Sequence, residues 1–378
     1  MKLSHITFPH KEGIYSAQAH ADLPKNTYER EISRDGFYGP STHMYHKHPL
    51  TSWQEWEGEL FPRAFDFNNM DCISQHPYEI QPFLYNSDTQ LHYWQCSEIM
   101  QHLIANADGD EILFIHGGHG EMFCDFGHIS YTEGDYILIP RSTQWRLEPK
   151  SLTTILMIEA TNEQFYLPEK GMLGSHAIFD RGMFKIPEIN DLFIKQQENL
   201  QFNKVQIKKL NKMNGITFPY NPLDAVGWKG EVTVAKINWR DIRPIISHRY
   251  NLPPSAHCTF ITKKFDVGTF VPRPIESDPG ALKVPFYHSN ADEDEFMFFH
   301  KGQFFSRDNI GPGMATFHQT GFVHGPHPKA LKIGMLGERK QTDEVAIKID
   351  FRNPAIIARL EEGVEIKNYK YSWLVEEK

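Results

Sequence analysis

The chain has 378 residues, 40% hydrophobic and 23% charged, and this length fits two globular domains better than one. Its formal net charge of -9 and the lack of any Lys/Arg run argue against a nucleic-acid-binding surface, so we expect a small-molecule substrate. The sequence opens without an apolar leader and contains no apolar stretch of about 18 residues, so we expect a protein that does not enter the membrane. Its four cysteines include no CxxC pair, which fits a reducing compartment, so we expect a cytoplasmic location.

Two stretches rich in strand-forming residues dominate the chain. The first covers residues 111–160 and includes EILFIHGGHGEMFC and LTTILMIEA, and a second of the same character covers residues 257–350. The 24 Pro and 26 Gly residues divide the sequence into short elements. This pattern predicts a mainly β protein with an internal duplication and a few short helices.

The segments around these stretches suggest where the domains divide. Residues 187–200 have the apolar spacing of a short helix, and the Lys/Asn-rich residues up to 215 are expected to form a solvated connection. Asn353 and Pro354 offer an N-cap and an N1 proline for a helix that would stop at Gly363. The expected parts are an N-terminal β unit with an extension (1–185), a helix and linker (186–215), a C-terminal β unit (216–350), and a helix and tail (351–378).

The second stretch fits the two motifs of a cupin barrel, H-x-H-x(3,4)-E-x6-G and, later in the chain, G-x5-P-x-G-x2-H. His288, Glu295 and Gly302 fall in the first motif, and Gly313 and His324 fall in the second. The sequence therefore predicts a bicupin, with two jelly-roll barrels of the double-stranded β-helix type.

The first stretch keeps the spacing of these motifs but lacks the metal ligands. Glu111 is followed by Gly118 at the motif distance, and Gly134 and Pro140 are followed by Trp145 where the second motif has its histidine. We expect the first barrel to bind no metal and to have a centre filled by side chains.

His288, Glu295 and His324 are the predicted ligands of one divalent metal. Two imidazoles and one carboxylate suit iron(II), manganese or zinc, and three protein ligands leave positions open for a substrate. A lone histidine at a barrel mouth would more often be a hydrogen-bonding residue, but the joint spacing of the three favours a metal centre.

Three segments between residues 226 and 350 also resemble a known family. PFYHSNADEDEFMFFHKG, MATFHQTGFVHGPHP and VGWKGEVTVAKIN are similar to segments of homogentisate 1,2-dioxygenases. The resemblance implies that His288, Glu295 and His324 hold Fe(II), that O2 is a co-substrate, and that a hydroquinone-like aromatic acid is cleaved in its ring.

The same resemblance implies further roles around the metal. His318 matches a histidine beside the ligands, and Asn290 matches an asparagine that lines the substrate site. A neutral histidine must accept a phenolic proton, and we favour His257 over His248 and His318 for this base.

Phe286 and Phe304 stand where the family has tyrosines, so the substrate can differ from homogentisate. Tyr287 and His327, in the same matching segments, are further candidates for the substrate site. Arg273, or else Arg339, could bind a substrate carboxylate, although arginines in β proteins are more often surface or ion-pair residues.

Two alternatives to a ring-cleaving dioxygenase stay open. One is a cupin of another class, either a zinc- or manganese-dependent isomerase or a different oxygenase; the other is a non-enzymatic, pirin-like binding bicupin. His46 and His48 in YHKHP resemble half of a metal motif, but no glutamate and glycine follow at cupin spacing. The family resemblance also implies a homo-oligomer, either a dimer, a trimer or a hexamer.

Overall fold

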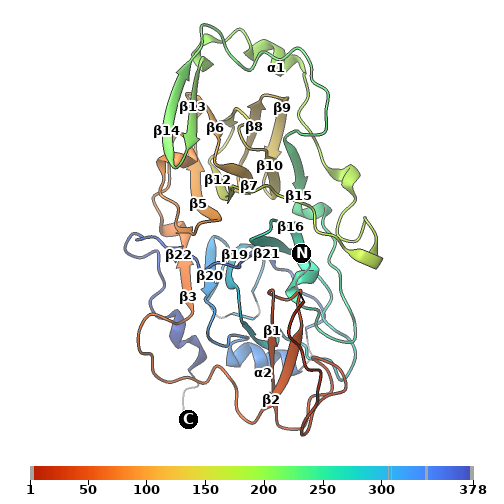
Figure 1. Ribbon diagram of the computed structural model, residues 1–378. Coiled ribbons are helices and arrows are strands. Elements are labelled where there is room, and N and C mark those ends of the chain that lie inside the picture. Colours follow the sequence, from red (N-terminus) through yellow and green to blue (C-terminus); the bar gives the residue numbers. More distant parts are fainter. Residues whose placement is uncertain (1–3, 305, 308, 337–338, 375–378) are drawn as a thin grey trace.

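The computed structural model describes residues 4–304, 306–307, 309–336 and 339–374, without the side chains of Asn290 and of residues 333–336. The described part of the chain is mainly β, as predicted, and its α-helices are α1 (Asp191–Gln196) and α2 (Pro328–Leu336). Two β units lie end to end, with the first unit at the top of Figure 1 and the second below it. Within the described ranges, no helix is long and apolar enough to cross a membrane.

The first unit consists of two packed sheets. One sheet has seven strands, in the order β15 (Ala235–Asn238), β10 (Asp135–Ile139), β7 (Gly109–Gly117), β12 (Thr153–Thr161), β5 (Thr89–Cys96), β4 (Leu84–Tyr85) and β22 (Ile356–Ile357). The other has six strands, in the order β14 (Lys212–Thr217), β13 (Lys204–Lys209), β6 (Leu103–Asn106), β11 (Trp145–Pro149), β8 (His119–Cys124) and β9 (Gly127–Thr132). Alternate residues of the two sheets face each other, and Trp94, Leu113 and Trp145 belong to the fully buried core that they form.

The second unit also has two sheets. A six-stranded sheet has the order β16 (Cys258–Ile261), β17 (Phe265–Phe270), β21 (Val345–Phe351), β19 (Asp294–Lys301), β20 (Met314–His318) and β3 (Arg63–Asp66). A three-stranded sheet has the order β18 (Tyr287–Asn290), β1 (Tyr28–Ser33) and β2 (Ser41–His46), with β1 parallel to β18 and antiparallel to β2.

The side-chain alternation of β19 separates a hydrophobic core from a pocket. Phe296 and Phe298 belong to the apolar core that joins the two units. Glu295, Met297 and Phe299 line a pocket inside the second unit. Because successive side chains of a strand point to opposite faces, one strand supplies both the packing between the units and a wall of the pocket.

Two glycines support the predicted duplication. Gly118 and Gly302 end their motifs with the same φ of +87°, a conformation that side chains rarely adopt. A Cβ at either position would collide with backbone, with the Leu152 carbonyl in the first unit and the Asp343 carbonyl in the second. The two motifs therefore make the same tight turn in the two units.

The units exchange strands, so the chain does not divide at one point. β1, β2 and β3 come from the N-terminal extension but complete the sheets of the second unit. β15 and β22 come from the C-terminal half but extend the seven-stranded sheet of the first unit. We therefore propose that the domains be defined by their sheets and not by a boundary at residues 186–215.

Two local predictions were wrong. Residues 204–217 form the hairpin β13–β14 and not a solvated connection, and β13 pairs in parallel with β6. The expected helix after Pro354 is absent from the described residues, because the Ala355 N–H donates to Asp294 Oδ2 (2.9 Å) and residues 356–357 pair with β4. Remote partners thus replace the local hydrogen bonds of a helix.

Candidate metal centre

The three predicted ligands converge inside the second unit. His288 lies in β18, Glu295 lies in β19, and His324 follows β20. All three are buried, and one ligand atom from each lies within 4.8 Å of the others. Residues 36 positions apart in the sequence are therefore gathered around one point.

Backbone pairing fixes these positions. The His288 N–H donates to the His324 carbonyl (2.9 Å) and the His324 N–H donates to the His288 carbonyl (3.0 Å), which joins the two segments in an antiparallel bridge. Glu295 of β19 pairs with His318 of the adjacent strand β20 in the six-stranded sheet. Each ligand is thus held by a hydrogen-bonded backbone and not by a free loop.

The side chains are oriented toward a common space. His288 Nδ1–H donates to the Phe286 carbonyl (3.0 Å), which leaves Nε2 of His288 directed to Glu295, 3.8 Å from Oε2. Nε2 of His324 lies 3.6 Å from Oε1 of the same carboxylate. Nε2 of both histidines is buried without a hydrogen-bond partner, a costly arrangement unless another group binds these atoms.

The electrostatics also suit a cation. Burial alone would raise the pKa of Glu295, but the imidazoles of His288, His318 and His324 around it, of which His318 donates a hydrogen bond, outweigh burial and hold that pKa well below its usual value. Burial, together with the nearby His288 and His318, lowers the pKa of His324 well below 6.5. An ionised carboxylate and a neutral imidazole are the forms that bind metals, so these residues fit a divalent first-row metal.

His318 supports the carboxylate. Its Nδ1–H donates to Glu295 Oε1 (3.0 Å), and its Nε2 lies 3.5 Å from the Tyr369 hydroxyl. Burial is the largest influence on His318 and lowers its pKa, although Glu295 acts in the opposite direction. A hydrogen bond of this kind fixes the orientation of a ligating carboxylate.

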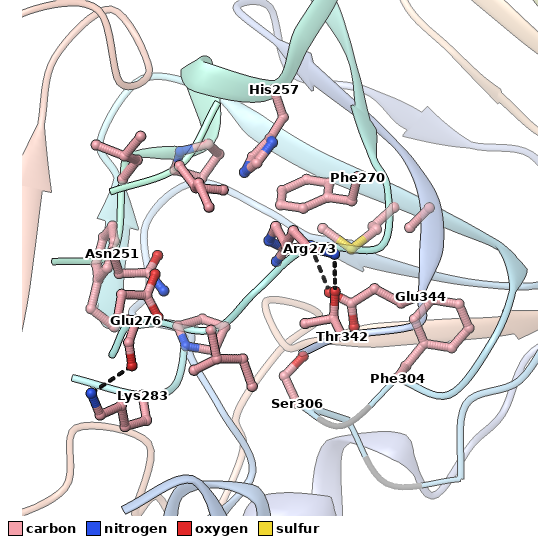
Figure 2. Close-up of a pocket in the computed structure, with 18 of the residues that line it drawn as sticks. Asn251, His257, Phe270, Arg273, Glu276, Lys283, Phe304, Ser306, Thr342 and Glu344 are labelled. Atoms are coloured by element: carbon pink, nitrogen blue, oxygen red, sulfur yellow. Dashed lines mark hydrogen bonds and ion pairs between the residues drawn. The ribbon is translucent and has the colours of Figure 1, made fainter. Parts of the chain in front are cut away.

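The pocket above these residues is partly apolar (Figure 2). Its lining includes His288 and Glu295 together with the apolar side chains of Phe270, Met297, Phe299 and Phe304. Figure 2 shows His257, Phe270 and Arg273 close together, with Glu344 and Phe304 to one side and Lys283 and Glu276 to the other. An apolar cavity with a few convergent polar groups is typical of a small-molecule site.

His257 ends a 3-10 turn (Pro254–His257) and lines this pocket. Its side chain is buried, its ring centroid lies 4.5 Å from that of Phe270, and its Nδ1 has no hydrogen-bond partner. Burial, with the cations Arg273, Lys348 and Lys170 nearby, lowers its pKa well below 6.5. The imidazole is therefore neutral at physiological pH and can accept a proton.

Arg273 also lines the pocket, where it forms an ion pair with Glu344 (3.1 Å). A guanidinium has five N–H donors, so this ion pair leaves others available to a ligand. Arg339, the other candidate for a carboxylate anchor, instead bonds the Gln341 carbonyl and Asp343 and does not line the pocket.

The remaining predicted residues divide into three groups. Phe286 and Phe304 line the pocket, as the sequence suggested. Tyr287 and His327 do not, because strand alternation turns Tyr287 away from the face of Phe286 and His288, and His327 packs 4.2 Å from the Trp373 ring. The side chain of Asn290 lies outside the described residues.

His248, the alternative base, is exposed and is absent from the pocket lining. Sequence reasoning missed Lys283, Glu344 and Met297 in that lining. For Met297 a signal existed, since it lies two residues after Glu295 on the same strand face. Lys283 and Glu344 come from distant segments, and no local pattern marks them.

Comparisons with known proteins bear on this site. Residues 83–238 match the family model described as homogentisate 1,2-dioxygenase N-terminal. A protein of Saccharolobus solfataricus named "Putative dioxygenase" is 28% identical over 97% of this chain and 99% of its own length. The homogentisate 1,2-dioxygenase of Bradyrhizobium diazoefficiens is 25% identical over 68% of this chain, and the match spans 59% of the relative's length. The resemblance to this dioxygenase family is thereby confirmed.

Solved cupin structures are also similar. The cupin 2 conserved barrel domain protein from Leptotrichia buccalis has a TM-score of 0.33 at 8% identity and covers 77% of this chain and 96% of its own. An oxalate decarboxylase of Bacillus subtilis has a TM-score of 0.36 at 11% identity and covers 82% of this chain and 81% of its own. At these scores the likeness has no bearing on activity.

Proposed function

We propose that this protein is an iron(II)-dependent dioxygenase that opens the ring of homogentisate or a related hydroquinone-like aromatic acid. One observation carries the proposal: two buried histidine nitrogens without partners converge on an ionised glutamate beside a pocket that contains a neutral histidine. The sequence similarity to dioxygenases supports the same reaction class.

His288, Glu295 and His324 would hold the iron, and His318 would keep the glutamate in place. Bound iron(II) supplies the electron-transfer chemistry that lets O2 react with an electron-rich ring. The protein would contribute three buried ligands and leave coordination positions open for the substrate and O2.

His257 would accept a phenolic proton at Nδ1 as the substrate binds. Its low pKa keeps it unprotonated, and the fact that it lines the same pocket as His288 and Glu295 supports this role. His257 would therefore act as the general base, while His288, Glu295 and His324 bind the metal.

The rest of the pocket would select the substrate. Phe270, Met297 and Phe304 offer apolar surface to an aromatic ring, and Arg273 offers N–H donors to a carboxylate. Phe286 and Phe304 cannot donate hydrogen bonds, so a substrate gains from these positions only apolar contact. We therefore include relatives of homogentisate among the candidate substrates.

The direct test is an aerobic assay of the iron(II)-reconstituted protein on homogentisate and other dihydroxyaromatic acids. We expect O2 uptake that matches the amount of ring-opened product. Product from none of these acids would refute the proposed reaction. Tight zinc or manganese without O2 uptake would point to an isomerase, and binding without turnover would point to a non-enzymatic cupin.

A His257→Gln variant tests the proposed base. We expect kcat to fall about 100-fold or more while iron content stays unchanged, which is typical of a lost general base. Because the pKa of His257 is well below 6.5, protonation of this residue would limit wild-type activity only below that pH. Unchanged kcat across the pH profile would exclude this role.

We further propose a cytoplasmic location and a homo-oligomeric state, the dimer, trimer or hexamer expected from the resemblance. Size measurement by light scattering tests the second point.

A further inference from the structure

A second histidine–glutamate cluster lies outside the pocket. Glu31 of β1 and His43 of β2 face each other directly in the antiparallel register, and His20 reaches them from the preceding segment. His20 and Glu31 are buried, and the His43 side chain is 21% exposed. Nothing in the proposed ring-cleaving chemistry uses these residues.

The distances within this cluster match those of a metal site. Glu31 Oε2 lies 3.1 Å from His20 Nε2 and 2.9 Å from His43 Nε2. Ligand atoms bound about 2.0–2.2 Å from zinc in a tetrahedron lie roughly 3.3 Å from each other. One ligand atom of each of the three residues lies within 4.8 Å of the others, so one ion could bind all three residues.

Glu29 orients His20 as metal ligands are commonly oriented. Nδ1–H of His20 donates to Glu29 Oε2 (2.6 Å), and the backbone N–H of His20 also donates to this carboxylate (3.1 Å). The Tyr45 hydroxyl donates to Glu29 Oε1 (3.3 Å). A carboxylate on one imidazole nitrogen orients the ring, and here it directs the other nitrogen, Nε2, toward Glu31.

The charges favour a cation at the same place. Glu29 and Glu31 bring two carboxylates into a buried cluster, and they lie 2.6 and 3.1 Å from the ring nitrogens of His20. Two buried carboxylates need a nearby positive charge, which a protonated imidazole or a metal ion can supply. Arg30, between them in β1, points to the other face and donates to Ser289 Oγ (3.0 Å). A divalent ion would balance this charge.

We propose that His20 Nε2, Glu31 and His43 Nε2 bind a second divalent cation of the zinc type, with water completing the coordination on the exposed side of His43. Two imidazoles and one carboxylate form a ligand set that zinc accepts, and Glu29 serves as the carboxylate behind His20.

This ion would also stiffen the wall of the pocket. The His20 ring stacks on Phe286, with centroids 3.7 Å apart and planes 9° apart, and the Phe286 carbonyl accepts the His288 hydrogen bond. Glu31 pairs with His288 in the register of β1 and β18. The cluster is therefore connected to the first centre through one aromatic ring and one strand pair.

Metal binding by variants separates the two centres. Cobalt(II) and zinc(II) titrations of metal-free protein should show two sites in the wild type, one in His324→Ala, one in His43→Ala, and none in the double variant. We expect His43→Ala to weaken the second site by more than about 100-fold, since even partners behind a ligand contribute 10–100-fold. His48→Ala, an exposed histidine just after the same strand, is the matched control and should keep both sites.

A single site in the wild type that His43→Ala leaves intact would overturn the proposal and identify the cluster as an ion-paired network without metal. If His43→Ala fails to fold, anomalous diffraction of wild-type crystals grown with zinc decides the question. Density bonded to His20, Glu31 and His43 supports the site, and its absence there overturns it. Loss of metal in His324→Ala alone concerns only the first centre.

Discussion

The two β units share the same spacing between motif positions but have different side chains at those positions. In the second unit His288 bridges to His324, and Glu295 comes seven residues after His288. In the first unit Ile104 pairs with Trp145, and Glu111 comes seven residues after Ile104. Each proposed ligand histidine thus has an apolar counterpart at the equivalent place in the first unit.

The two glutamates show how much their neighbours matter. Glu295 lies among three histidines, of which His318 donates a hydrogen bond to it, and has a pKa well below its usual value. Burial raises the pKa of Glu111 to about 7, although the Tyr78 hydroxyl and the Asn106 amide donate to it at 2.6 and 2.8 Å. The same backbone position therefore stabilises the anion in one unit and makes ionisation harder in the other, so the surrounding side chains and not the fold decide the chemistry.

The largest effect is expected from His324→Ala, which makes the second unit resemble the first. Loss of a ligand should reduce iron affinity by more than about 100-fold and reduce turnover to background. Elemental analysis and O2 uptake measure both, with His119→Ala, an exposed histidine of the first unit, as the control. Full iron content in His324→Ala would refute the proposed ligand set.

Trp145→Ala tests the opposite claim, that the first unit uses this position only for packing. Truncation of a fully buried tryptophan should lower the free energy of unfolding by about 3–5 kcal/mol. Chemical denaturation measures this, and the iron content of the folded variant should not change. A loss of iron without a loss of stability would contradict the claim that Trp145 serves only packing.

Glu111→Gln tests whether the raised pKa of Glu111 makes the free energy of unfolding depend on pH. Because the folded state raises this pKa from 4.5 to about 7, the carboxyl group contributes stability below pH 4.5, and this contribution is lost as the pH rises through 7. The variant should remove a pH dependence on the order of 3 kcal/mol across that window. Unfolding free energies of both proteins at several pH values give the comparison, and equal slopes would contradict it.

The smallest effect is expected from His318→Ala. His318 contacts Glu295 and is not a proposed ligand, so its loss should weaken iron binding by about 10–100-fold without abolishing it. Competition with a chelator measures this affinity. An effect as large as that of His324→Ala would instead make His318 a ligand.

The sequence predicted those features of the two units that depend on the spacing of residues close together in the chain. Turns such as that at Gly302 require a positive φ, so a short motif marks them and fixes the distance to Glu295. The sequence could not predict which strand pairs with the strand of His288, because β1 is more than 250 residues away in the chain. The sequence does not predict the hairpin β13–β14, because β14 is exposed along its whole length and its residues, KMNGIT, show no apolar alternation.

The His20 cluster shows the same limit. Its three residues fit no motif, and two of them meet only through the pairing of β1 with β2. The histidines that did fit a partial motif, His46 and His48, are not part of it.

The strand exchange has a consequence for how the protein is made. β1 is synthesised early, but Ser289, which accepts a hydrogen bond from Arg30 of β1, is added to the chain 259 residues later. At about 5–20 residues per second, the ribosome needs roughly 13–50 s to deliver that partner. During this interval the β1–β2 hairpin has an unpaired edge, and its charged residues Glu29, Arg30 and Glu31 are the kind that discourage an exposed edge from pairing with other chains.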